Sequence, residues 1–481
     1  MESGLMLPGA VNETRMPESA VTESINFHFD SIGAATVRPG STILGNSMGA
    51  SVSGMHYFVD TINASPKSQM IAVAGTQALY LSGGTWTAIR TGLTAGSKAR
   101  FSTLCNFSFM CNQTEPTAVW DGNTAGGFVT TGNALNAPQG NLAETFRNRM
   151  WIAGTAANPS RVYYSTVIDP AALTITWNNS VQFFDVSFAD GDYMTGLQRF
   201  RQVLVVFKSN HIYRVFDIGQ SDPDPYYAVG TYSQESIVES KIGLFFHHST
   251  GFYHYDVYGI VQEISRPIID IIKAIPSSAY ANVTGWIDPL GDHICWALGP
   301  VTVRGVTYTN LEVRYTLSTM VWTHYQRPYR VVASLRRQPL YNDGTTLFPL
   351  TGDTNGNVYM MDYGNTDNGV AISYSLIHRW DTFDGLLSTR MNIMQVNFCH
   401  YGGAGSTVAY QTELQDPDDL NNWTNKVDQG RLGSINTGFN SANIKGRKIR
   451  FRIFGSASGP FIYNGFEVLD VQNEFIQFSQ P

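Results

Sequence analysis

The sequence predicts an all-β fold: a β-propeller of six or seven blades, with an N-terminal extended arm and a C-terminal β-sandwich-like unit. Two observations predict the propeller. A short unit recurs, in which an apolar β run, a turn of small or polar residues and a second β run with an aromatic follow one another. Its aromatics stand 40, 43, 50 and 40 residues apart, at Tyr80, Trp120, Tyr163, Tyr213 and Tyr253. This period is close to the roughly 40–50 residues of one four-stranded blade.

The composition agrees with an extensive β protein that has many tight turns. Aromatic residues make up 12% of the 481 residues, and Gly, Asn, Thr and Ser are abundant. Aromatic side chains favour strands, and small polar residues favour turns. Charged residues reach only 14%, against about 25% in typical soluble domains. The low charge indicates that partners cover much of the surface.

Three segments follow from this pattern. Residues 1–68 are rich in Ser, Thr, Asn and Gly and are expected to form an extended arm that leads into the first blade. Residues 69–375 carry the repeats and are expected to form the propeller. Residues 376–481 hold alternating strands without the repeat spacing, which predicts a β-sandwich.

The repeat becomes less regular after Tyr253. The next anchors, Tyr315 and Tyr359, follow after 62 and 44 residues, and the added length contains a segment at 299–310 that reads as an inserted β-hairpin. The blade count therefore depends on whether the arm supplies a strand that closes the ring.

One segment, residues 265–275, has the spacing of a short helix rather than a strand. Pro267 suits a first helical turn, and five apolar residues follow it. We expect this helix to pack against a blade edge; an interaction element is the alternative.

Bulk properties exclude several classes of protein. The net charge of −7 argues against a nucleic-acid reader, which needs a basic face, but an acidic wall still lets DNA slide past without gripping it. The four cysteines form no CxxC pair and are expected to be reduced and mostly buried. No signal peptide and no apolar run of membrane-helix length is expected, so synthesis is expected in a cytoplasm.

No motif predicts an enzyme. Glycoside hydrolysis needs two carboxylates about 5–10 Å apart, and the acidic residues of the propeller carry no such signature; they include Asp190, Asp192, Glu235, Glu239 and Asp256. We expect these to be turn carboxylates, and we expect no catalytic residue and no cofactor.

Two patterns resemble metal sites but do not predict one. Residues 353–357 begin like a calcium loop, yet the terminal Glu is absent, so an ordinary hairpin turn is expected. His247 and His248 alternate across a strand and face opposite sides. We therefore expect no metal.

Basic residues gather in two places of this charge-poor chain, and one further arginine lies in the arm. The candidate partner or phosphate contacts are Arg38, Arg327, Arg330, Arg336, Arg337, Lys445, Arg447, Lys448, Arg450 and Arg452. In the second cluster, alternation places Lys448, Arg450 and Arg452 on one strand face and apolar residues on the other. Three interpretations stay open: a solvated sheet face, a salt-bridge surface for another protein, and phosphate contact.

The order of parts resembles the tail hub, or nozzle, proteins of short-tailed bacteriophages, also called packaged-DNA stabilisation proteins. The N-terminal stretch ends in the turn Val37-Arg38-Pro39-Gly40. Mid-chain, Gly196-Leu197 leads through a short basic stretch into the apolar run 203–207 and then Ile212-Tyr213. A β unit without repeats closes the chain, with a basic strand at 447–453 and a last strand at 461–471.

This resemblance implies a structural virion protein without catalytic residues. It implies a six-fold ring under the portal and its adaptor ring, with a channel that retains and then passes double-stranded DNA without sequence specificity. It also implies docking of a fibre, spike or needle, and a place in the virion tail. The alternatives are a carbohydrate- or receptor-binding propeller and, less favoured, a propeller glycoside hydrolase.

Overall fold

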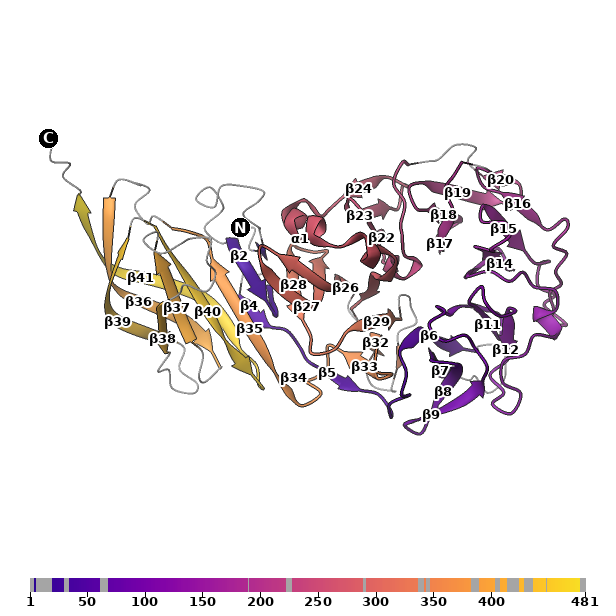
Figure 1. Cartoon of the computed structure of the whole chain (residues 1–481), viewed down its shortest axis with the longest axis horizontal. Coiled ribbons are helices and arrows are strands. Elements are labelled where there is room, and N and C mark those ends of the chain that lie inside the picture. Colours follow the sequence, from indigo (N-terminus) through magenta and orange to yellow (C-terminus); the bar gives the residue numbers. More distant parts are fainter. Residues whose placement is uncertain are drawn as a thin grey trace.

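The structure is a computed structural model of the whole chain. It describes residues 4–5, 20–29, 34–60, 68–188, 190–221, 227–288, 291–335, 341–342, 347–381, 389–402, 407–412, 424–427, 436–446 and 448–475. The predicted fold class is confirmed: the chain is an all-β propeller, and its other strands form a second β unit beside the ring (Figure 1).

The first five blades follow one another along the chain. Each is an antiparallel sheet of three or four strands. Their strands are β6 (Val52–Val59), β7 (Ser68–Ala74), β8 (Gln77–Ser82) and β9 (Thr85–Arg90); β10 (Arg100–Leu104), β11 (Phe107–Cys111) and β12 (Ala118–Trp120); β13 (Leu142–Phe146), β14 (Arg149–Ala153), β15 (Arg161–Tyr164) and β16 (Phe183–Asp185); β17 (Met194–Phe200), β18 (Val203–Lys208), β19 (Ile212–Asp217) and β20 (Gln220–Ser221); and β21 (Val238–Glu239), β22 (Gly243–His248), β23 (Gly251–Asp256) and β24 (Val261–Glu263).

Two further blades complete a ring of seven among the described residues. Blade six consists of β25 (Thr284–Ile287), β26 (His293–Val303), β27 (Val306–Thr316) and β28 (Trp322–Gln326). Blade seven consists of β29 (Val331–Ser334), β32 (Leu350–Asp353), β33 (Val358–Met361) and β5 (Ser41–Ile43). The first strands of the blades line the axis, and β29 lies against β6 to close the ring.

The repeat anchors occupy one structural position. Tyr80, Trp120, Tyr163, Tyr213, Tyr253, Tyr315 and Tyr359 all lie on the third strand of a blade, in seven successive blades. The spacing lengthens before Tyr315 because β26 and β27 are 11 residues each and meet at a turn at Arg304–Gly305, which confirms the predicted hairpin. Apolar clusters fill the spaces between consecutive blades, so each anchor strand contributes to a core between sheets.

The N-terminal segment takes part in both units. β5 supplies the outermost strand of blade seven by pairing with β33, with Ser41 opposite Met361. Residues 41–43 and 52–59, which the sequence assigned to the arm, therefore form strands β5 and β6 of the propeller. Their Ser- and Gly-rich composition hides the β pattern, because a strand between two packed sheets tolerates small residues where the backbones approach closely.

The second unit is a sandwich of two sheets. One sheet runs β2 (Ala20–Ile25), β35 (Val370–His378), β40 (Ile449–Ala457), β37 (Thr407–Thr412) and β38 (Thr424–Val427). The other runs β3 (Phe27–Phe29), β4 (Ala35–Val37), β41 (Ile462–Phe475), β36 (Thr389–Tyr401) and β39 (Asn436–Gly446). A shared apolar core, which includes Phe27, Tyr374, Phe398, Phe451 and Phe461, lies between them.

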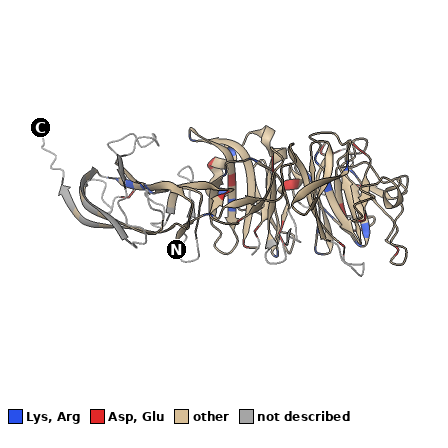
Figure 2. Cartoon of the chain, turned by 90° about the horizontal axis from the view of Figure 1, so that it is seen from below, with Lys and Arg blue, Asp and Glu red and all other residues tan. Residues whose placement is uncertain are grey.

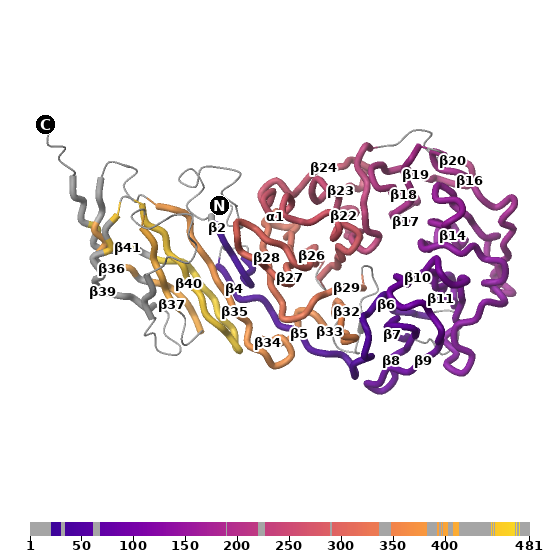
Figure 3. Tube along the Cα trace, in the orientation of Figure 1, coloured from indigo at the N-terminus to yellow at the C-terminus, as the bar shows by residue number. Residues whose placement is uncertain are grey.

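The sheet of blade six continues into the sandwich. β2 pairs in parallel with β28, where Ile25 lies opposite His324, and pairs antiparallel with β35 on its other side. Figure 3 shows the indigo N-terminal trace running beside the orange and yellow strands before it enters the ring. We call the β2–β28 pairing the seam, because it joins the two units through main-chain hydrogen bonds.

The predicted short helix is confirmed. η4 (Arg266–Ile268) leads into α1 (Ile269–Ala274). Ile268, Ile271 and Ile272 are buried in the apolar cluster between blades five and six, against Trp296. The helix therefore packs on a blade, as expected.

Charged residues are sparse along the ribbon, as Figure 2 shows. No helix among the described residues is long and apolar enough to cross a membrane.

Candidate functional site

Two of the predicted basic contacts, Arg38 and Arg327, lie inside the molecule. Arg38 donates from Nη1 to Asp367 Oδ1 at 2.9 Å, and from Nε to Asn26 Oδ1 at 2.8 Å. Arg327 donates from Nε to both oxygens of Glu312 at 2.9 Å, and Nη1 lies 3.4 Å from Asp367 Oδ1. We call these four charged residues the junction network.

The junction network is buried and pairs two arginines with two carboxyl groups. Arg38, Arg327, Glu312 and Asp367 are each at most 4% exposed. Burial raises the pKa of the Asp367 carboxyl, but hydrogen bonds and charges from Arg38 and Arg327 outweigh burial and leave its pKa lowered. Burial dominates at Glu312, so its pKa is raised despite the two arginines. The guanidinium groups of Arg38 and Arg327 are therefore used within the chain and are not presented to a partner.

The basic face of β40 also turns inward. Arg450 is 4% exposed, donates from Nη2 to Gln411 Oε1 at 2.6 Å and lies 4.6 Å from the centre of the Trp380 ring. Arg452 donates from Nε to Ser375 Oγ at 3.0 Å. The predicted alternation is present, because Ile449 and Phe451 face the sandwich core. The interpretation of a solvated face is wrong for Arg450, because its guanidinium is buried against Gln411 and Trp380.

The other predicted basic residues are placed differently. Arg330 and Lys448 are half-buried. A Cβ placed on Gly299 would come within 3.3 Å of Arg330 Nε, so the guanidinium covers that backbone turn. Arg336, Arg337 and Arg447 lie outside the described residues, and the side chain of Lys445 is not among those described. Phosphate or partner contact at these positions stays a prediction.

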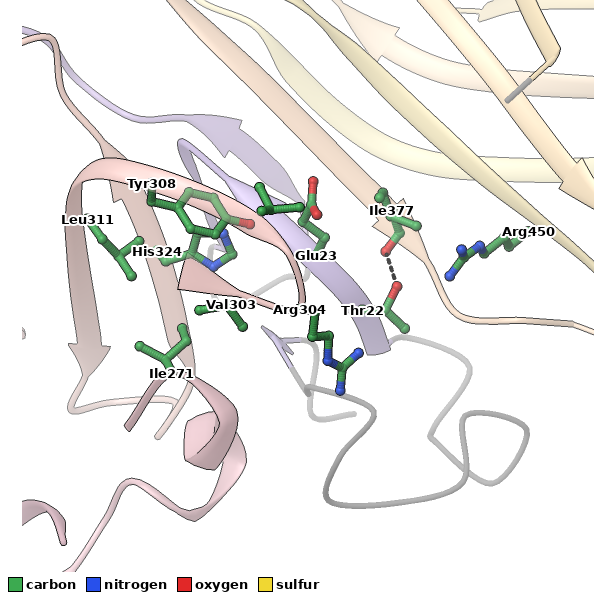
Figure 4. A pocket seen from close by; sticks show the side chains of 11 residues that line it. Thr22, Glu23, Ile271, Val303, Arg304, Tyr308, Leu311, His324, Ile377 and Arg450 are labelled. Atoms are coloured by element: carbon green, nitrogen blue, oxygen red, sulfur yellow. Dashed lines mark hydrogen bonds between the residues drawn. The ribbon is translucent and has the colours of Figure 1, made fainter. Parts of the chain in front are cut away.

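A cavity of about 50 Å³ lies beside the seam, between α1, the β26–β27 hairpin and the sandwich (Figure 4). We call it the seam cavity. Its polar side chains are Glu23, Arg304, Tyr308, His324 and Arg450, together with Thr22. Its apolar walls are Ile271, Val303, Val306, Leu311 and Ile377.

Burial controls the electrostatics of the seam cavity. It raises the pKa of the Glu23 carboxyl against the opposing charges of Arg452 and Arg450 and a hydrogen bond from Ser375. Burial also lowers the pKa of His324 to about 4, so this imidazole is neutral at pH 7. The seam cavity thus combines a buried carboxyl, a neutral imidazole and a phenol.

Sequence reasoning missed this site because its parts are distant in the chain. Glu23 lies in the segment that was expected to form an arm. His324 lies in an ordinary strand about 300 positions further along the chain. No local motif links them, and only the parallel pairing of β2 with β28 brings them together.

The acidic residues considered for catalysis serve turns and blade contacts. Asp190 accepts from the buried Lys208 ammonium at 2.6 Å. Asp192 and Asp256 each accept from backbone amides of nearby turns. Glu239 accepts from Gln198 Nε2 at 2.9 Å.

Glu235 takes part in a contact that spans the propeller axis. Arg100, at the start of the second blade, donates from Nε to Glu235 Oε1 at 2.7 Å, and Lys98 Nζ lies 3.4 Å from Glu235 Oε2. Glu235 lies on η3 (Gln234–Ser236), between the fourth and fifth blades. Since the second blade is a neighbour of neither the fourth nor the fifth in the ring, these ion pairs connect elements across the propeller axis.

The two metal-like patterns have ordinary roles. Asp353 Oδ1 accepts from the amides of Asn355 and Asn357 at 2.8 Å, which closes the expected hairpin turn. His247 packs against Phe252 and Tyr280, whereas His248 contacts Thr250, on the other side of the strand. Across the described ranges, no group of three His, Cys, Asp or Glu side chains lies close enough to hold a metal ion.

Comparison with known proteins shows distant structural likeness. No family model matches the chain, and no curated protein matches it. One solved structure that resembles it is the extracellular domain of a protein described as a hybrid two-component system, BT3049 of B. thetaiotaomicron, at 9% identity and a TM-score of 0.47, over 88% of this chain and 58% of that one. The corresponding domain of BT4673 matches at 11% identity and a TM-score of 0.45, over 67% of this chain and 39% of that one. The WD40 propeller domain of Doa1 matches at 10% identity and a TM-score of 0.41, over 67% of this chain and 96% of that domain.

Proposed function

We propose that this chain is a structural virion protein: the tail hub or nozzle of a short-tailed bacteriophage. In this proposal six copies form a ring beneath the portal and its adaptor ring. The ring retains and then passes double-stranded DNA, and a fibre, spike or needle docks on it. The sequence resemblance described above supports the proposal.

One structural observation carries it further. The propeller and the sandwich are joined by a continuous sheet across the seam and by the junction network. A conduit subunit must hold its parts in fixed relation while DNA moves past it. Two units tied by main-chain pairing and buried ion pairs meet that requirement better than two domains on a flexible linker.

Reconstitution tests the proposal. The full chain is mixed with the adaptor ring encoded beside the same portal gene and imaged by electron microscopy, and an adaptor from an unrelated phage is the control. We expect six copies of the chain on the cognate adaptor ring and none on the control adaptor ring. Without any adaptor, the chain should be a monomer. A chain that stays monomeric with the cognate adaptor contradicts the proposal.

A second candidate is a carbohydrate- or receptor-binding propeller. Loop tips of the ring display Phe188, Tyr193 and Tyr258 at 75%, 55% and 80% exposure, and exposed aromatics are common in binding surfaces. The eight tryptophans that the structure describes are all buried, however, so exposed Tyr and Phe side chains would have to provide the contact. Saturable binding of the isolated chain on a glycan array favours this candidate over the first.

A further inference from the structure

Four exposed apolar side chains lie at one end of blades five and six. They are Ile242 in the turn between β21 and β22, Tyr258 and Ile260 in the turn between β23 and β24, and Met320 in the turn between β27 and β28. Their exposed fractions are 46%, 80%, 54% and 73%, in that order. In an antiparallel blade, the turn between the first two strands and the turn between the last two lie at the same end. We call these three turns, at that end of the propeller, the turn surface.

Contacts between strands place the three turns beside one another. Within blade five, Gly243 pairs with Asp256, so the turn before Gly243 lies next to the turn that begins at Asp256. Blade six follows blade five in the ring (Figure 1), and the ring centres of Phe245 and Tyr315 are 6.3 Å apart. Tyr315 stands at the end of β27, directly before the third turn. A partner of the turn surface therefore contacts two blades.

The backbone amides of the two blade-five turns are already paired. Asp256 Oδ1 accepts from the amides of Tyr258 and Ile260, each at 2.8 Å. The Ile242 amide donates to Ser240 Oγ at 3.2 Å. An unpaired amide is costly in an apolar environment. These turns can therefore enter such an environment without leaving those donors unsatisfied.

Two exposed cations flank the apolar side chains. Lys241 precedes Ile242, and Arg201 lies in the corresponding turn of blade four. Neither makes an ion pair within the described part of the chain, although Arg201 lies over the ring of Phe200. The acids nearby are engaged, since Asp256 holds the turn amides and Asp217 of blade four pairs with Arg147. The turn surface thus offers unpaired positive charge beside apolar side chains.

This combination favours a lipid surface over a protein partner. The apolar side chains stand on turns at the end of the propeller, where a flat partner reaches all of them at once. Lysine is depleted in protein–protein interfaces. Apolar side chains bordered by Lys and Arg are instead typical of elements that lie in the headgroup region of a membrane. The charge of that region is negative in anionic bilayers, which complements Lys241 and Arg201.

We propose that the turn surface binds the headgroup region of an anionic lipid bilayer. Its four apolar side chains enter between the headgroups. Lys241 and Arg201 stay at the level of the phosphates, because their long stems let the charged ends reach water. The contact is peripheral and needs no membrane span. This inference is independent of the proposed function.

Vesicle binding by the full chain tests the proposal. The probes are vesicles of phosphatidylcholine alone and vesicles in which about one third of the lipid is phosphatidylglycerol, which carries the negative charge. Flotation measures binding at about 0.1 M and about 1 M salt. Tyr258→Trp adds a local reporter, because the eight tryptophans that the structure describes are buried. Its emission minus that of wild type reports whether position 258 leaves water.

We expect wild type to reach half-saturation at anionic lipid on the order of 1 mM, and to be released at high salt. Binding to phosphatidylcholine alone should be much weaker. Lys241→Glu and Tyr258→Ser should each weaken binding about tenfold or more, and the emission of Tyr258→Trp should shift to the blue on anionic vesicles.

Matched controls lie at the opposite end of the propeller, where the connections between blades run. Lys273→Glu changes an exposed residue of α1, and Tyr193→Ser changes a side chain that is 55% exposed before β17. Both should bind vesicles within about twofold of wild type, since attraction to the bilayer falls off within a Debye length. All variants are first compared with wild type in unfolding temperature, which substitutions of exposed side chains should leave unchanged.

Three results overturn the proposal. The first is that wild type does not bind at about 10 mM anionic lipid, tenfold above the expected half-saturation; a turn surface that is covered by a protein would give this result. The second is that Lys241→Glu and Tyr258→Ser bind as well as wild type. The third is that Tyr258→Trp floats with the vesicles without a blue shift, which would place the contact elsewhere on the chain.

Discussion

At the scale of single residues, burial decides what an ion pair contributes. Arg327 and Glu312 are almost wholly buried, whereas the Arg304–Asp270 pair has side chains 38% and 21% exposed. Removing one partner of a buried pair leaves an uncompensated charge and costs about 3–5 kcal/mol, while an exposed pair contributes about 0–1 kcal/mol. We therefore expect Arg327→Met to lower the free energy of unfolding by about 3–5 kcal/mol. Urea unfolding measures this, with Arg304→Met as the control of equal length; equal losses in both variants would contradict the assignment.

His324 gives the molecule a pH dependence of known sign. Its pKa is about 4 in the folded chain and about 6.5 when unfolded. A lowered pKa means that the folded state resists protonation, so its contribution is intact above pH 6.5 and is lost as pH falls toward 4. Glu23, with its raised pKa, has the opposite effect on stability. The wild-type chain and the variant His324→Phe both contain Glu23, so its effect cancels when the two are compared. Between pH 7 and pH 5, wild type should lose about 2 kcal/mol more than His324→Phe, as measured by urea unfolding at each pH. Parallel pH profiles would show that His324 is not buried neutral.

At the scale of elements, the repeat identified one aromatic-bearing strand in each blade, because one aromatic per blade packs into the core between sheets; the structure shows that this is the third strand. The closing strand was not predictable, because β5 is three residues long and lies more than 300 positions before its partner β33 in the sequence. The basic strand β40 shows the same limit. Alternation correctly separated its two faces, but the burial of Arg450 depends on Gln411 and Trp380, which are 39 and 70 positions away in the sequence and which no local pattern links to it. The seam cavity escaped prediction for the same reason.

Gly352 on β32 marks where the last blade closes on the first. A Cβ at this position would lie 2.6 Å from Val52 Cβ on β6, and forced overpacking costs about 1–3 kcal/mol. We expect Gly352→Ala to lower the unfolding free energy by that amount in the wild-type chain and by less in a Val52→Ala background, which lacks the Val52 Cγ1 and Cγ2 atoms that lie 2.6 and 2.8 Å from the new Cβ. Gly459→Ala, where nothing lies within 4 Å of the new methyl group, should be near neutral. An equal cost of Gly352→Ala in both backgrounds would show that the strain lies elsewhere.

At the scale of the whole molecule, two units share one sheet and one ion network. Asp367 is the central acceptor of that network, since both Arg38 and Arg327 contact its carboxylate. Units coupled this strongly unfold together, because neither keeps its buried charges paired once the other has unfolded.

We expect calorimetry of the wild-type chain at pH 7 to give one transition. Asp367→Asn keeps the shape but removes the charge, so it should separate the unfolding of the propeller from that of the sandwich into two transitions. Asp217→Asn is the matched control, because Asp217 pairs with Arg147 at the surface, with side chains 43% and 48% exposed, and it should leave a single transition. Two transitions in the wild-type chain would mean that the seam does not couple the propeller to the sandwich. The structural support for a conduit role, which depends on that coupling, would then be gone.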